Sequence, residues 1–193
     1  GTVGATTTLA VASYEGGDGV DIVTNTATGN LQGAVQLGDG LTNSVTNAGH
    51  IEYGVDGGTG KDTVINSGSI TGHSAAAVSL GDNNDVLTNF SGAVHGTVTG
   101  IIDMGDGNDT VNGGNNAETV TDGNGADAYK LGGGNDTYIA TGSHDGGDGT
   151  DTVDGGIGID TYDASAAVSL VVLNLDTAQH GEPSGLNFYT PGT

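Results

Sequence analysis

Residues 104–139 have the sequence MGDGNDTVN, GGNNAETVT, DGNGADAYK and LGGGNDTYI, four nonapeptides that follow one another without a gap. Each begins with a loop-forming segment, carries an acidic residue at its sixth position and has a large apolar residue at its eighth. Glycine permits the tight turn, and a strand after it points alternate side chains inward, the eighth residue among them. Such internal periodicity predicts a solenoid in which each repeat forms one segment of a coil.

The nonapeptide recurs on both sides of this stretch. In the second half two series of loops alternate, which predicts a narrow coil of two nonapeptides per turn. In the first half an asparagine–glycine motif, such as Asn66-Ser-Gly-Ser-Ile70, replaces one of the two loops. There we predict a wider coil with a single acidic loop. The loops of the first series start at residues 16, 37, 57, 80, 104, 122 and 146, and those of the second at residues 113, 131 and 155.

The composition does not suit an ordinary apolar core. Of 193 residues, 39 are glycine and only 34% are hydrophobic, against roughly 45–50% in a typical domain. Lys61 and Lys130 alone oppose 24 carboxylates, so the net charge is −22. Such a chain would be disordered without another source of stability, because ordering so much glycine costs entropy. The regular repeat therefore predicts that bound cations supply the stability.

The same composition excludes several classes of partner and site. Nucleic acids and anionic membrane surfaces require clusters of basic residues, and this chain has two. The absence of cysteine excludes disulfides and thiolate metal sites. No apolar run reaches the ~20 residues that span a bilayer, so we expect no membrane insertion. No signal peptide is seen, and the abrupt start at Gly1 leads us to expect a piece of a larger protein.

The loops offer oxygen ligands, which suits calcium. Ca²⁺ takes about six to eight oxygens from carboxylates and backbone carbonyls. One loop cannot supply that many, so we expect roughly five to eight ions, each lying between loops of neighbouring coils. We predict as ligands the sixth-position aspartates Asp21, Asp62, Asp85, Asp109, Asp127, Asp136, Asp151 and Asp160, the third-position aspartates Asp18, Asp106 and Asp148, and the loop glycines Gly57, Gly105, Gly107, Gly146 and Gly155.

Together these patterns predict an all-β fold, a right-handed parallel β-helix or β-roll solenoid with calcium ions between stacked turns. Residues 1–103 would form the wide-coil part with one calcium-loop edge, and residues 104–163 the narrow β-roll. Residues 164–193 leave the repeat. We expect an apolar strand over residues 164–175 which, with the tail that follows, caps the end of one continuous solenoid.

With these motifs the chain resembles the RTX (repeats-in-toxin) calcium-binding repeats of bacterial proteins exported by type I secretion. The similarity is tight over residues 104–163 and looser over residues 16–103, which also resemble repeats of large bacterial surface and adhesin-type proteins. The resemblance implies a parallel β-roll, calcium held between loops, export through a Gram-negative type I secretion system and folding outside the cell. Three positions depart from the pattern: Asn43 and Glu118 replace aspartate, and Asn83 replaces glycine.

We therefore expect a calcium-binding module of a secreted or cell-surface bacterial protein, serving as a structural or adhesin-type spacer that folds on calcium binding outside the cell. Calcium is the expected partner, with host or surface glycans as the partner class of an adhesive version. The alternative is a non-catalytic accessory region of a type I-secreted enzyme, such as a protease, lipase or polysaccharide-modifying enzyme. The sequence upstream of Gly1 in the full gene would distinguish the two.

No catalytic residue is predicted, and we do not expect the chain itself to be an enzyme. It has no G-x-S-x-G nucleophile motif, and a polysaccharide lyase would need basic residues for an acidic glycan. His50, His73 and His95 recur about one coil apart, but in different columns of the asparagine–glycine motif. We expect exposed loop histidines there, not a catalytic or metal-binding ladder. Three tyrosines take the apolar eighth position and are expected in the core: Tyr129, Tyr138 and Tyr162.

Overall fold

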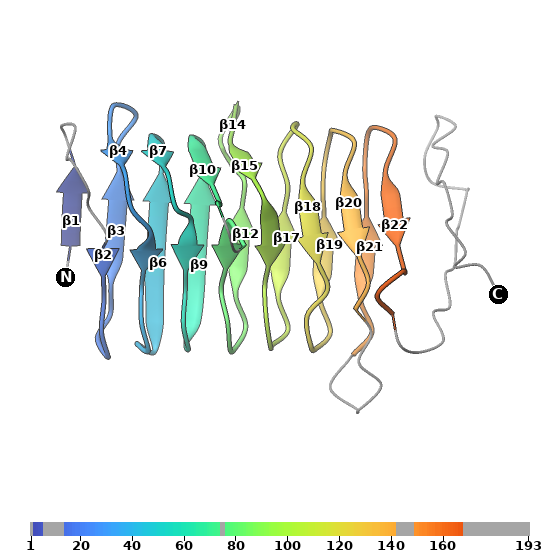
Figure 1. The fold of residues 1–193 in the computed structure, drawn as a ribbon, viewed down its shortest axis with the longest axis horizontal. Helices are drawn as coiled ribbons and strands as arrows, with labels where there is room; N and C mark the ends of the chain where they lie inside the picture. The colour runs from blue at the N-terminus through green and yellow to red at the C-terminus, as the bar shows by residue number, and fades with distance from the viewer. Residues whose placement is uncertain (1, 6–13, 74–75, 142–148, 168–193) are drawn as a thin grey trace.

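The computed structural model describes residues 2–5, 14–73, 76–141 and 149–167. Within these ranges the regular secondary structure consists of β-strands alone. The strands lie side by side on successive coils of a solenoid, in the order of the chain (Figure 1). Each described coil contributes strands to two long parallel sheets, here called sheets A and C. The predicted all-β parallel solenoid is confirmed.

Sheets A and C each have eight strands, and neighbours in a sheet come from successive coils. Sheet A consists of β1 (Thr2–Ala5), β3 (Ile22–Asn25), β6 (Thr42–Asn47), β9 (Lys61–Asn66), β12 (Val86–Thr88), β17 (Thr110–Asn112), β19 (Ala128–Lys130) and β21 (Thr152–Asp154). Sheet C consists of β2 (Tyr14–Glu15), β5 (Val35–Gln36), β8 (Val55–Asp56), β11 (Val78–Ser79), β16 (Ile101–Asp103), β18 (Thr119–Thr121), β20 (Thr137–Ile139) and β22 (Thr161–Asp163).

A third parallel sheet, sheet B, accompanies only the earlier coils. Its four strands are β4 (Asn30–Leu31), β7 (His50–Ile51), β10 (Ser69–Thr71) and β15 (Thr97–Thr99). These coils are therefore three-sided, and the described coils after β15 have strands in sheets A and C alone. A short antiparallel pair, β13 (Phe90–Ser91) and β14 (Val94–His95), lies just before β15 and was not predicted.

The core consists of inward-facing side chains that stack in columns, one residue from each successive coil. In sheet A, Val64 pairs in register with Leu87, Leu87 with Val111, and Val111 with Tyr129, and all four are fully buried. This places the eighth residue of the repeat inside, as its period of two predicts. Tyr138 is buried as well, with its ring centroid 5.1 Å from that of Tyr129. The rings thus fill the interior of the narrow coils.

The described part of the chain has no helix of the length and apolarity needed to cross a membrane. Sheet B falls within residues 30–99, inside the segment predicted to have wide coils. The predicted strand over residues 164–175 does not begin at 164, because residues 164–167 form a turn in which Ala167 N–H donates to the carbonyl of Ala164 at 3.1 Å. From residue 168 onward the predicted cap lies outside the described residues.

Candidate metal sites

The sixth-position acids of the first loop series line one edge of the solenoid, where each coil turns from sheet C into sheet A. The backbone N–H of Asp62 donates to Oδ1 of Asp85 at 2.7 Å, and that of Asp85 to Oδ1 of Asp109 at 2.7 Å. Asp109 and Asp127 are joined in the same way at 2.7 Å. We call this row the first acid column, formed by Asp21, Asn43, Asp62, Asp85, Asp109, Asp127 and Asp151.

The second oxygen of several of these carboxylates has no donor. Oδ2 of Asp62, Asp85 and Asp109 is buried and accepts no hydrogen bond from any described residue. The three side chains are at most 1% exposed, so solvent does not compensate. Leaving a buried polar group without a partner costs roughly 1–3 kcal/mol, and more when the group is charged. These oxygens therefore fit a bound cation, which would neutralise and coordinate them.

Glycine allows successive loops to stack closely around this column. Gly105 has a φ of +89°, and a Cβ there would overlap the carbonyl oxygen of Gly81 in the preceding coil. The next residue, Asp106, donates its N–H to that same carbonyl at 2.7 Å. Gly57 lies against its own loop's acid, because a Cβ there would overlap Oδ2 of Asp62. The loop backbone thus closes over the carboxylate.

A second acid column runs along the opposite edge, where the narrow coils turn from sheet A into sheet C. It consists of Glu118, Asp136 and Asp160. Glu118 N–H donates to Oδ1 of Asp136 at 2.8 Å, and Asp136 N–H to Oδ1 of Asp160 at 3.0 Å. Oε2 of Glu118 and Oδ2 of Asp136 are buried and accept no hydrogen bond within the described ranges. A Cβ on Gly155 would lie 2.5 Å from Oδ2 of Asp160, so this loop also closes over its acid.

Burial raises the pKa values of the column carboxyls. Desolvation raises the pKa of Asp85 to about 8, and the neighbouring charges of Asp109 and Asp62 add to the effect. Desolvation likewise raises the pKa of Asp109 to about 7 and that of Glu118 to about 7. The pKa of Asp136 is raised for the same reason. Near neutral pH, stacked carboxyls of this kind require either protons or cations between them.

The amino-terminal end of the first acid column is stabilised differently. The Tyr14 hydroxyl donates to Oδ1 of Asp21 at 2.7 Å, and Gly17 N–H donates to its Oδ2 at 3.1 Å. These donors, the tyrosine first, lower the pKa of Asp21 to about 2. Asn43 occupies the next place: its Oδ1 accepts the N–H of Asp21 at 3.0 Å, and its Nδ2 donates to Oδ1 of Asp62 at 2.9 Å. The departure at Asn43 therefore keeps the column and places an amide in it.

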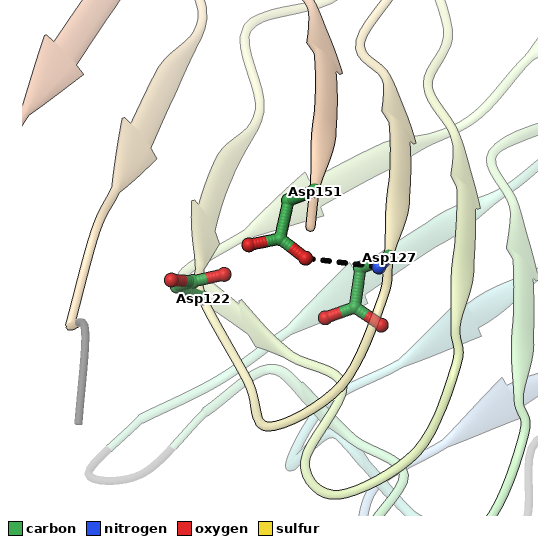
Figure 2. Close-up of side chains that lie close together, drawn as sticks. All are labelled: Asp122, Asp127 and Asp151. Atoms are coloured by element: carbon green, nitrogen blue, oxygen red, sulfur yellow. Dashed lines mark hydrogen bonds between the residues drawn. The ribbon is translucent and has the colours of Figure 1, made fainter. Parts of the chain in front are cut away.

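Three carboxylates gather near the other end of the first acid column (Figure 2). Asp122, Asp127 and Asp151 each offer one oxygen, and these oxygens all lie within 4.8 Å of one another. Asp127 N–H donates to Oδ1 of Asp151 at 2.9 Å. The hydroxyl of Tyr138 donates to Oδ1 of Asp122 at 2.5 Å, and that of Tyr129 to Oδ2 of Asp127 at 3.0 Å. Three acidic oxygens at this separation could coordinate one cation.

Asp122 was not predicted as a ligand. It takes the first position of its loop, where the preceding coil of the same series has Met104 and the other loops have glycine or leucine. Both residues are buried, so an acid stands at a place in the stack where the other loops have glycine or an apolar side chain. Aligning the loops by coil, instead of reading each nonapeptide alone, would have exposed this exception.

The other predicted ligands are less enclosed. Asp18 and Asp106 are exposed, and Oδ1 of Asp106 accepts a hydrogen bond from Nδ2 of Asn124 at 2.6 Å. Gly107 has a φ of +154°, and a Cβ on it would overlap the carbonyl of Asn83 in the preceding coil. Asp151 and Asp160 are half-buried, whereas Gly146 and Asp148 lie outside the described residues.

The histidines form no ladder within the described ranges. Nε2 of His50 lies 2.6 Å from Oε2 of Glu52, and Nε2 of His73 lies 2.8 Å from Oε1 of the same carboxylate. His95 is in β14, with its ring against Phe90. The expectation of exposed loop histidines is wrong for His50, which is half-buried in β7, where its Nδ1 contacts the Ser69 hydroxyl at 2.6 Å. His95 is exposed as expected, but it lies in a strand and not in a loop.

Comparison with known proteins finds no similar protein. The chain matches no protein-family model, and searches of curated proteins and of solved structures find no match either.

Proposed function

We propose that this chain is a calcium-binding module of a secreted or cell-surface bacterial protein, and that it folds when calcium binds outside the cell. The observation that supports this most directly is the set of buried carboxylate oxygens without a donor, on Asp62, Asp85 and Asp109 in one column and on Glu118 and Asp136 in the other. The role is structural, with no catalysis assigned to the chain.

The ligand chemistry favours calcium over other cations. The buried columns offer carboxylate oxygens, and the loops above them are rich in backbone carbonyls, with no cysteine in the chain. Hard oxygen ligands in irregular loops suit Ca²⁺, which accepts variable geometry at about 2.3–2.6 Å. Mg²⁺ requires near-octahedral ligands and gives up its water reluctantly. A net charge of −22 also makes cation uptake favourable overall.

Binding and folding would be coupled in this chain. Each column places acids from successive coils in hydrogen-bonded contact, so the sites exist only when the coils are stacked. Extracellular calcium sites have dissociation constants of roughly 10⁻⁴–10⁻³ M. The chain would therefore stay unfolded in a calcium-poor cytosol and fold after export. The RTX resemblance supports this proposal and adds type I secretion as the route.

Far-UV circular dichroism during a calcium titration tests the proposal. In metal-free buffer at pH 7.5 we expect a coil-like spectrum, and near millimolar Ca²⁺ a cooperative rise in strand signal. The same titration with Mg²⁺ is the control and should produce little change. A metal-free chain with the full strand signal and the same thermal midpoint as the calcium-loaded one would contradict the proposal.

A further inference from the structure

Two histidines from successive coils share one carboxylate beside sheet B. Nε2 of His50 lies 2.6 Å from Oε2 of Glu52, and Nε2 of His73 lies 2.8 Å from Oε1 of the same group. His50 and Glu52 belong to the coil of β7, whereas His73 follows β10 in the next coil. The three side chains therefore join neighbouring coils, and none of them belongs to an acid column.

The backbone of β7 positions the first two side chains. Ile51 is fully buried, and the N–H of Glu52 donates to the carbonyl of Leu31 at 2.8 Å, so the pairing with the preceding coil continues through Glu52. Residues two apart in such a segment point to the same face. His50 and Glu52 therefore point outward together, and each side chain is 35% exposed.

Each imidazole has a second contact that orients it. Nδ1 of His50 lies 2.6 Å from the Ser69 hydroxyl, and the ring of His73 lies against that of Tyr53, with centroids 4.5 Å apart. In metal sites, one ring nitrogen of a histidine binds the ion while the other is hydrogen-bonded to a neighbouring group. The Ser69 hydroxyl can donate or accept, so it can orient His50 with or without an ion at Nε2.

Glu52 supplies a charged oxygen ligand. Hydrogen bonds with His50 first, and then with His73, lower the pKa of Glu52, so its carboxylate is ionised near neutral pH. An ionised carboxylate only accepts, so without a metal each Nε2 donates its hydrogen to it. An ion would replace those two hydrogens. The rings contact different oxygens, so one ring has to turn, and the His73 side chain is 43% exposed, which leaves it room to do so.

We propose that His50, Glu52 and His73 form a site for a divalent transition metal such as Zn²⁺, separate from the acid columns. The inference goes beyond the proposed function, since it concerns a different class of metal. Two imidazole nitrogens and a carboxylate suit zinc or copper, whereas Ca²⁺ takes oxygen ligands. Three protein ligands leave a fourth position for water. The bound ion would link two successive coils.

The test is His73→Ala in the full chain, with His95→Ala as the matched control. His95 is exposed in β14 with its ring against Phe90, so its variant removes the same side chain away from the site. Zinc binding is measured by isothermal titration calorimetry in excess calcium, to keep zinc off the acid columns. Losing only a hydrogen-bonding partner of a metal ligand weakens binding roughly 10- to 100-fold. We therefore expect H73A to weaken the tightest Zn²⁺ site by at least about tenfold and H95A to leave it unchanged.

Copper provides a second measurement, which needs no variant. Cu²⁺ bound to the wild type should show two nitrogen ligands by electron paramagnetic resonance, since the site has two imidazoles. Glu52→Gln should weaken zinc binding as His73→Ala does. Far-UV circular dichroism in the same buffer verifies that each variant is folded, and the copper spectrum of the wild type decides the matter if they are not.

Two results would overturn the inference. One is equal zinc affinity in H73A and the wild type, and the other is a copper spectrum without two nitrogen ligands. The zinc result is a difference between variants, so it can be read whether or not calcium binds. The calcium titration of the wild type alone decides the proposed function, and the two proposals therefore fail independently.

Discussion

At the residue scale, Asp85 shows the balance of forces in the acid columns. Its Oδ1 accepts the N–H of Asp62 at 2.7 Å, which fixes the side chain beneath the loop. Its Oδ2 is buried without a donor among the described residues, and desolvation raises its pKa to about 8. The same carboxylate therefore opposes folding when it is ionised and bare, and favours folding when a cation lies against it.

Asp85→Asn should separate these two effects. Without metal we expect the variant to be more stable than the wild type by roughly 1–3 kcal/mol at neutral pH, because the wild-type carboxyl must take up a proton or be buried as a charge. With calcium we expect weaker ion binding, since a ligand charge is lost. Without calcium the change is measured as residual strand signal by circular dichroism, and with calcium by urea unfolding. Asp82→Asn in the same loop is the control, because Asp82 is exposed. Equal effects of the two substitutions would refute the assignment.

At the element scale, the loops stack because glycine occupies the places where one coil presses on the next. Gly105 combines a left-handed backbone with a carbonyl contact that a Cβ would overlap. Gly19, in the first loop, has open space where a Cβ would stand. The repeat therefore contains glycines that the stack requires and others that only follow the pattern. The sequence of the nonapeptide does not distinguish these two kinds of glycine, since the difference depends on whether a Cβ would meet atoms of the neighbouring coil.

Gly105→Ala should therefore destabilise the calcium-loaded protein markedly. The left-handed φ alone costs roughly 1–2 kcal/mol for a residue with a Cβ, and the overlap with the Gly81 carbonyl adds to it. Gly19→Ala should change the thermal midpoint little. Differential scanning calorimetry at saturating calcium compares the two variants, and a larger loss at position 19 than at position 105 would count against the loop geometry.

Much of this arrangement could be predicted from sequence, because the repeat fixes the coil. The parallel sheets and the inward eighth residue follow from spacing, and Val64, Leu87 and Val111 stack as expected. The relation between columns could not be predicted from single nonapeptides. That Asn89 bonds to Glu118, and that Asp122 faces Asp127, depends on which residues meet when coils of unequal length are stacked.

At the scale of the whole molecule, whose net charge is −22, the acid columns should make the stability of the metal-free fold depend on pH. Unfolded carboxyls titrate near pH 4, whereas the folded pKa values of Asp109 and Glu118 are about 7 and that of Asp85 about 8. Protonation of these groups therefore contributes stability that is fully present below about pH 4 and is lost as the pH rises through 7 to 8. Asp21, with its lowered pKa of about 2, acts in the opposite sense, below this range.

In metal-free buffer we thus expect a larger strand signal by circular dichroism at pH 5 than at pH 8, where the chain should be coil-like. Saturating calcium is the control, and it should weaken or reverse the trend because the ion favours the ionised carboxylates. A metal-free strand signal that increases from pH 5 to pH 8 would mean that the buried acids are not the groups that govern stability.

The tyrosine stack has a practical consequence. The chain has no tryptophan, so its ultraviolet emission comes from its 6 tyrosines. Two of these phenols, Tyr129 and Tyr138, donate directly to carboxylates of the Asp122, Asp127 and Asp151 group. Any ligand that binds those oxygens must alter the environment of the two rings. The protein therefore carries a built-in fluorophore at one of its candidate sites, and occupancy there can be followed without a dye or a label.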